Sequence, residues 1–255
     1  MPVIPISDLP QSTPLSGAEI FPIVQGGTTR QISASAINGG VNSVVTGPNA
    51  TVGGGINNTA SGNCSSVVGG RNNTASGNNT SVGGGSYNTA SNINTFVGGG
   101  FCNTASGSYS NVAGGYCNTA SVNCSNVVGG TSNKACGTFS SVVGGGYNTA
   151  SGSVSFIGGG GLNTASGGYS SVGSGYNNNA CAVHSGILGG SLNTVLSAHT
   201  CSFIIGSNLI SNAACTTFVN NLSAQGAIYA GNGFTGDIAG CTSIIVTNGI
   251  ITAAS

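Results

Sequence analysis

The sequence predicts an all-β protein, a parallel β-solenoid built from coils of about 15 residues. Two short elements, N-T-A-S and V-x-G-G, both recur with this period over most of the chain. The 255 residues include 47 glycines and only 2% charged residues, a composition that disfavours helices. A unit of this length is too short for a helix pair but accommodates two short strands and two turns.

The N-T-A-S motif marks one strand and one bend of each coil. It begins at Asn58, Asn73, Asn88, Asn103, Asn118, Asn148 and Asn163, with degenerate forms at Asn133, Asn178 and Asn193. In-register stacking would place these side-chain amides about 4.8 Å apart, the spacing at which asparagine ladders hydrogen-bond along an axis. The asparagines are therefore predicted to form a structural ladder.

Strand alternation assigns the inward and outward side chains of each coil. The predicted core consists of Val67, Val82 and Val97 from one strand, and Ala75, Ala90 and Ala105 from the other. The predicted surface ladder consists of Thr74, Thr89, Thr104 and Thr119. One valine and one alanine are too little core for a coil to fold alone, so stability must come from stacked neighbours.

The repeat divides the chain into three parts. Residues 41–207 form the predicted solenoid, and its phase slips after Asn193. Residues 1–40 precede it, and residues 208–255 are predicted to form a β-rich cap. Within this cap, Asn248-Gly249 lies between two apolar runs, which is a strong hairpin signal. A cap is expected because an uncovered last coil would expose a sheet edge.

The charged residues exclude several classes of function. Asp8, Glu19 and Asp237 are the only carboxylates, so the repeat offers no acid-base pair, and we predict no enzyme and no catalytic residue. Arg71 and Lys134 are too few to neutralise a run of phosphates, which excludes nucleic-acid binding. No apolar run reaches the length of a membrane span, and the N-terminus lacks the pattern of a secretory signal.

Seven of the nine cysteines lie in residues 41–207 and are substitutions within the repeat. Cys102 and Cys117 fall on adjacent coils, within the Cα range of a disulfide, but their parallel side chains fit a bridge badly. We interpret the cysteines as small apolar fillers that stay reduced in the cytoplasm. No C-x-x-C motif is present and no histidine supports a metal site, so neither a metal nor a cofactor is predicted. His184 follows Cys181 by three residues but has no acid to orient it.

Aromatic residues recur on the unit in separate registers. Tyr109, Phe139 and Tyr169 share one register, and Phe96 and Phe156 share another. Two interpretations remain open at this point. The rings either cover the solenoid or an inter-chain seam, or they form a carbohydrate-binding stripe.

Residues 40–207 resemble the heads of trimeric autotransporter adhesins of the YadA type. The resemblance rests on Ser-Val-Val-Gly at 66–69 and Thr-Ala-Ser-Gly at 74–77, which match the two strand motifs of that family. It implies a left-handed parallel β-roll with three chains around a threefold axis, and an adhesive or structural role at a surface.

Residues 5–37 resemble the N-terminal segments of tail-fibre and related appendage proteins of tailed phages and other large viruses. The matching pieces are I-S-D-L-P, G-A-E and P-I-V-Q-G-G-T-T-R. The resemblance implies that residues 1–40 attach the chain to other virion proteins. The sequence-based hypothesis is therefore a homotrimeric structural fibre of a tail or capsid appendage, made in the host cytoplasm without a signal peptide and located in the virion. Attachment to a host-surface receptor or glycan is compatible with it.

Two alternatives come from other classes of protein. The repeat also fits a bacterial surface adhesin located at the cell surface. The regular threonine and serine ladder resembles the faces of ice-binding solenoids, which the low charge also fits.

Overall fold

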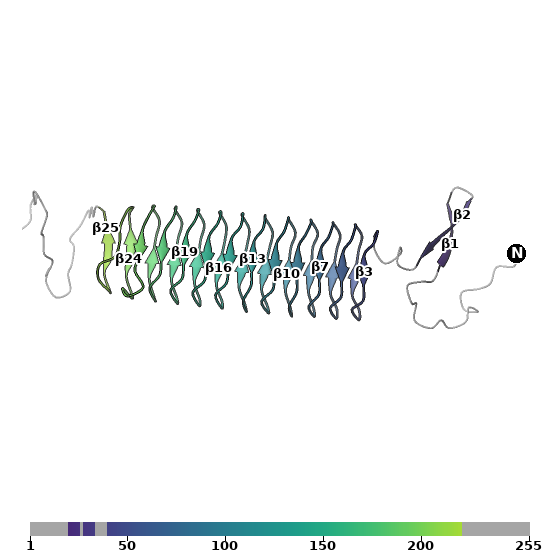
Figure 1. The fold of residues 1–255 in the computed structure, drawn as a ribbon, viewed down its shortest axis with the longest axis horizontal. Coiled ribbons are helices and arrows are strands. Elements are labelled where there is room, and N and C mark those ends of the chain that lie inside the picture. Colours follow the sequence, from purple (N-terminus) through teal and green to yellow (C-terminus); the bar gives the residue numbers. More distant parts are fainter. Residues whose placement is uncertain (1–19, 26–27, 34–39, 221–255) are drawn as a thin grey trace, which may run out of the picture. The chain divides into compact units, whose positions relative to one another are not determined.

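A computed structural model describes residues 40–220 of the chain and two earlier strands, β1 (Ile20–Gln25) and β2 (Thr28–Ser33). These parts contain strands and no helix, and residues 40–220 form a parallel β-solenoid (Figure 1). The predicted fold class is thereby confirmed. Strands β1 and β2 form an antiparallel pair that runs from Ile20 opposite Ser33 to Gln25 opposite Thr28.

The first solenoid sheet, here called the threonine sheet, contains 11 parallel strands. They are β3 (Val44–Val45), β5 (Thr59–Ala60), β7 (Thr74–Ala75), β9 (Thr89–Ala90), β11 (Thr104–Ala105), β13 (Thr119–Ala120), β15 (Lys134–Ala135), β17 (Thr149–Ala150), β19 (Thr164–Ala165), β21 (Asn179–Ala180) and β23 (Thr194–Val195). Each N-T-A-S motif supplies one of these strands, because its threonine and alanine form the paired residues.

The second sheet, here called the valine sheet, contains 12 parallel strands. They are β4 (Thr51–Val52), β6 (Ser66–Val67), β8 (Ser81–Val82), β10 (Phe96–Val97), β12 (Asn111–Val112), β14 (Asn126–Val127), β16 (Ser141–Val142), β18 (Phe156–Ile157), β20 (Ser171–Val172), β22 (Gly186–Ile187), β24 (Phe203–Ile205) and β25 (Thr217–Val219). Figure 1 shows the coils following one another along a common axis, with one strand of each coil in each sheet.

Each coil turns at two corners. The asparagine corner joins a valine-sheet strand to the next threonine-sheet strand, as at residues 113–118, and the serine corner makes the return, as at residues 121–125. Both corners contain a residue with left-handed backbone, for example Cys117 (φ 53°) and Cys124 (φ 57°). The asparagine corner also needs a glycine with positive φ. A Cβ at Gly130 would collide with the carbonyl oxygen of Gly145 in the next coil.

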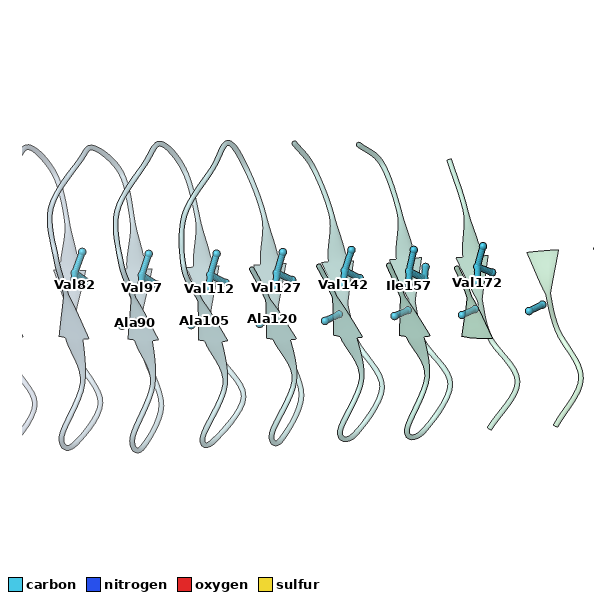
Figure 2. Close-up of a cluster of buried hydrophobic side chains, with 14 of the residues drawn as sticks. Val82, Ala90, Val97, Ala105, Val112, Ala120, Val127, Val142, Ile157 and Val172 are labelled. Atoms are coloured by element: carbon cyan, nitrogen blue, oxygen red, sulfur yellow. The ribbon is translucent and has the colours of Figure 1, made fainter. Parts of the chain in front are cut away.

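In each regular coil, each of the two sheets contributes one buried apolar side chain to the interior. The side chains of Val67, Val82, Val97, Ala75, Ala90 and Ala105 are fully buried. Figure 2 shows the valines of one sheet and the alanines of the other in a continuous stack. A buried asparagine and a buried serine or threonine complete each regular coil, so half of the buried side chains are polar.

The solenoid continues beyond residue 207, the end predicted from the sequence. Gly186 pairs with Phe203, two residues later than the regular period requires. The serine corner absorbs the difference, because seven residues (196–202) separate β23 from β24 where five are usual. Phe203 then pairs with Thr217, which adds β25 as a further strand of the valine sheet. The hairpin predicted around Asn248-Gly249 lies outside the described residues.

Candidate functional site

The asparagine row forms an internal clamp. The side-chain amide nitrogen of Asn118 donates to the carbonyl oxygens of Gly114 in its own coil and Gly130 in the next, each at 2.9 Å. Its Oδ1 accepts from the backbone N–H of Asn133, also at 2.9 Å. The same three bonds recur at the predicted ladder positions from Asn58 to Asn163. The clamp therefore ties each corner to the following coil.

These bonds differ from the amide-to-amide ladder that the sequence predicted. The donors go to glycine carbonyls because the tight, glycine-containing corner turns those oxygens toward the amide nitrogen. A side-chain to side-chain bond appears at the end of the row, from Asn193 Nδ2 to Asn178 Oδ1 at 3.0 Å. The row is thus a set of side-chain to backbone clamps, and all seven predicted asparagines are fully buried in it.

The outer face of the threonine sheet carries the predicted hydroxyl ladder. Thr74, Thr89, Thr104 and Thr119 stack in register and are half-buried. Lys134 takes the next place in this row, with an exposed side chain, between Thr119 and Thr149. The ladder is therefore regular over a limited stretch, and a cation interrupts it.

The outer face of the valine sheet is apolar in places. Its outward side chains lie at the first strand residue and at the residue after the strand, on either side of the buried valine. We call the large apolar members the apolar row: Phe96, Phe156, Phe203, Val68, Val128, Val143 and Leu188, which are 42–68% exposed. On the same face, Asn111 Nδ2 donates a hydrogen bond of 3.0 Å to Asn126 Oδ1. The two faces of the solenoid thus differ in chemistry.

Aromatic side chains line both corners. The predicted register of Tyr109, Phe139 and Tyr169 lies at the serine corner, and each ring is about 60% exposed. At the asparagine corner, Phe101 stacks on Tyr116 with ring centroids 5.3 Å apart and planes 8° from parallel. Tyr87 adds a tilted ring 5.5 Å from Phe101.

Sequence reasoning missed this last stack. The spacing of Phe101 and Tyr116 by one period could have revealed their contact, whereas Tyr87 lies at the neighbouring unit position. Stacked rings support adjacent coils by about 1 kcal/mol per pair. Because Phe101 and Tyr116 cover each other's faces, they serve cohesion between coils.

The solenoid is nearly uncharged, since residues 40–220 contain Arg71 and Lys134 and no carboxylate. Burial raises the pKa of the Cys136 thiol, and the nearby Lys134 ammonium opposes that shift. Within the described residues, no three His, Cys, Asp or Glu side chains come together as a metal site would require. No helix in that part of the chain is long and apolar enough to cross a bilayer.

Comparison of the chain with models of known protein families gives no match, and comparison with curated protein sequences gives none.

Proposed function

We propose that the chain is a structural fibre protein of a virion appendage and that three copies assemble side by side. The observation that carries the proposal is the continuous strand pairing of the valine sheet from β4 to β25. Backbone ladders and asparagine clamps join each coil to the next, so residues 40–220 form a stiff spacer. A spacer of this kind holds its two ends apart, which is the task of a fibre.

The apolar row supports the trimer. Val68 and Leu188 are more than 60% exposed, and the phenylalanines of the row project from the same sheet. Apolar residues that gather on one face commonly mark a protein interface. We place the seam between chains on the valine sheet, so that the threonine sheet faces water.

The two ends have separate roles in this proposal. Residues 1–40, which resemble appendage attachment segments and contain the β1–β2 pair, bind other virion proteins. Any contact with a host receptor or glycan lies in residues 208–255. Deletion of residues 216–255 should then abolish adsorption to the host, and unchanged adsorption would remove the receptor role from that region.

Light scattering on a size-exclusion column tests the trimer. The expected mass is three times 24.4 kDa, and a monomer would overturn the proposal. The double substitution Val128→Lys and Val143→Lys should release monomers, because it introduces charge into the seam. The matched control is Thr104→Lys with Thr119→Lys on the opposite face, where Lys134 already occupies the row. This control should remain trimeric.

A test of location separates the virion fibre from the bacterial adhesin. Antibodies against residues 40–220 should label an appendage of purified particles in electron microscopy. Label on cells that carry no virus would favour the surface adhesin.

Ice binding is the second candidate, and the stacked row from Thr74 to Thr119 is the observation that favours it. Regularly spaced hydroxyls on a parallel sheet can order water, whereas the Lys134 ammonium breaks that order. An ice-recrystallisation assay distinguishes the candidates. Inhibition by the natural chain that Thr104→Lys abolishes would favour ice binding, and no inhibition would exclude it.

A further inference from the structure

Four cysteines form two pairs on adjacent coils. Cys102 and Cys117 lie at the asparagine corner, and Cys201 and Cys215 lie at the serine corner. All four have left-handed backbone, with φ between 53° and 60°. The second pair is hidden in the sequence, because the repeat has already slipped and the two cysteines no longer lie one full period apart.

The two pairs share one backbone relation. The amide of Cys117 donates to the carbonyl oxygen of Phe101, the residue before Cys102, at 2.8 Å. The amide of Cys215 donates in the same way to Thr200, the residue before Cys201, at 2.9 Å. Parallel β-pairing sets the spacing of adjacent coils at about 4.8 Å. That spacing falls inside the Cα separation of about 4.4–6.8 Å that disulfides require.

All four cysteines lie at corners, where the side chains of adjacent coils need not run parallel as they do within paired strands. A poor fit to a bridge is expected for two residues fixed within paired strands, but none of these four cysteines belongs to a strand. A change of rotamer in one thiol can therefore turn it toward the other. Burial raises the pKa of the Cys117 thiol, and the adjoining Cys102 thiol raises it further, which is consistent with contact between them.

The two thiols of the first pair differ in access. The side chain of Cys102 is exposed, whereas that of Cys117 is half-buried, and all four cysteines are free thiols. The exposed thiol therefore meets a dissolved oxidant first, and its neighbour is placed to complete the reaction.

We propose that Cys102–Cys117 and Cys201–Cys215 are oxidation sites at which a disulfide links each coil to the next. A low-molecular-weight disulfide such as oxidised glutathione is the oxidant. The Cys102 thiolate attacks one sulfur of oxidised glutathione, the glutathione S–S bond breaks, and one glutathione thiolate leaves. The Cys117 thiolate then attacks Cys102 Sγ, forms the coil-linking bond and releases the second glutathione. The two thiol protons end on the two glutathione molecules, and Cys201 and Cys215 react in the same way.

This inference does not depend on the proposed fibre function. The first bridge would close a loop of one full period, and the second would close a loop one residue shorter. The second bridge lies where the regular period ends, between the coils of β24 and β25. Oxidation would therefore link adjacent coils covalently both in the regular part of the solenoid and at its irregular C-terminal end.

Peptide mapping of the full chain tests the proposal. Reduced protein is incubated with excess oxidised glutathione at about pH 8, near the ordinary pKa of a thiol, so that part of each thiol is thiolate. Remaining thiols are blocked in acid, and the denatured chain is digested with chymotrypsin. Cleavage after Tyr109 and Phe203 places the members of each pair in different peptides. We expect disulfide-linked peptides for both pairs, each with a mass lower by two hydrogens than the sum of its reduced parts.

The chain supplies matched controls in Cys64 and Cys124, which have the same left-handed corner backbone but no cysteine at the stacked position 15 residues before or after. These should carry glutathione. Cys102→Ser should leave glutathione on Cys117 while the Cys201–Cys215 bridge still forms. Stable glutathione on all four paired cysteines, or linkage between separate chains alone, would overturn the proposal.

Discussion

The two corners of each coil solve the same turning problem by different means. In the coil of Asn118, the asparagine corner carries a fully bonded buried amide that reaches into the next coil. At the serine corner, Ser125 bonds within its own turn, to Val122 at 2.6 Å. Its counterparts Ser65, Ser110, Ser155 and Ser170 have buried hydroxyls with no hydrogen-bond partner.

The difference shows where the register of the solenoid is determined. The serine corner accepts two extra residues before β24, and the stack continues across them. The asparagine corner keeps one length from Asn58 to Asn193, because each clamp bonds the carbonyl four residues earlier within the same corner. The partner in the next coil lies 12 residues ahead of Asn58 but 13 ahead of Asn193. The next corner, where Leu209 stands at the asparagine position, is one residue shorter, because Ile204 pairs with Ile187 and Ile210 with Thr194. The asparagine corner therefore keeps its length where the asparagine is present, whereas the serine corner tolerates variation.

Removal of a clamp should have the largest effect. Asn118→Ala leaves the Gly114 carbonyl and the N–H of Asn133 without a partner, whereas the Gly130 carbonyl keeps its bond from the N–H of Tyr116. Each unpaired group costs about 1–3 kcal/mol, so with two such groups we expect a loss of about 2 kcal/mol or more in unfolding free energy. Denaturant unfolding measures it. A loss below about 1 kcal/mol, the net worth of a single ordinary hydrogen bond, would remove the distinction between the corners.

Two neighbouring glycines give the next test. Gly130→Ala forces an alanine to φ +90° and against the carbonyl oxygen of Gly145, whereas a Cβ at Gly129 would meet no atom within 4 Å. Backbone strain of this kind costs about 1–3 kcal/mol. Thermal unfolding should show a clear decrease for Gly130→Ala and almost none for Gly129→Ala. Equal effects would contradict the geometry of the corner.

Overpacking the interior tests the thin core between the corners. Ala105 is fully buried against alanines of the coils before and after it. Ala105→Leu or Ala120→Leu should cost about 1–3 kcal/mol and impair assembly, because no space exists for the added carbons. Circular dichroism melting and native mass report the result. Normal melting would show that these alanines do not limit the interior.

The serine corner should give the smallest effect. Ser110→Ala removes a buried hydroxyl that has no hydrogen-bond partner, so stability should change by less than about 0.5 kcal/mol or rise slightly. The same denaturant series used for Asn118→Ala measures it. A loss as large as that of Asn118→Ala would reveal an unrecognised partner of the Ser110 hydroxyl.

The regular part of this architecture could be predicted because the period is visible in the sequence. A period of two within each strand separates Val67 and Ala75 from their outward neighbours, and the structure buries both side chains. The bonding of the asparagines could not be predicted, because it depends on how the glycine corner turns its carbonyl oxygens. Strand β25 escaped detection because one coil longer than the period and one shorter than it follow the regular coils. The Cys201–Cys215 juxtaposition was hidden for the same reason.

The reach of the clamp has a consequence for how such a chain can change over generations. Each asparagine amide bonds its own coil and the following one, and no coil further away. Gain or loss of one complete repeat unit therefore restores the same partners on both sides of the junction. Unequal recombination between repeats would lengthen or shorten the rod in whole steps of about 4.8 Å. Because of the clamp, the number of repeats in the gene determines the length of the solenoid in units of one coil.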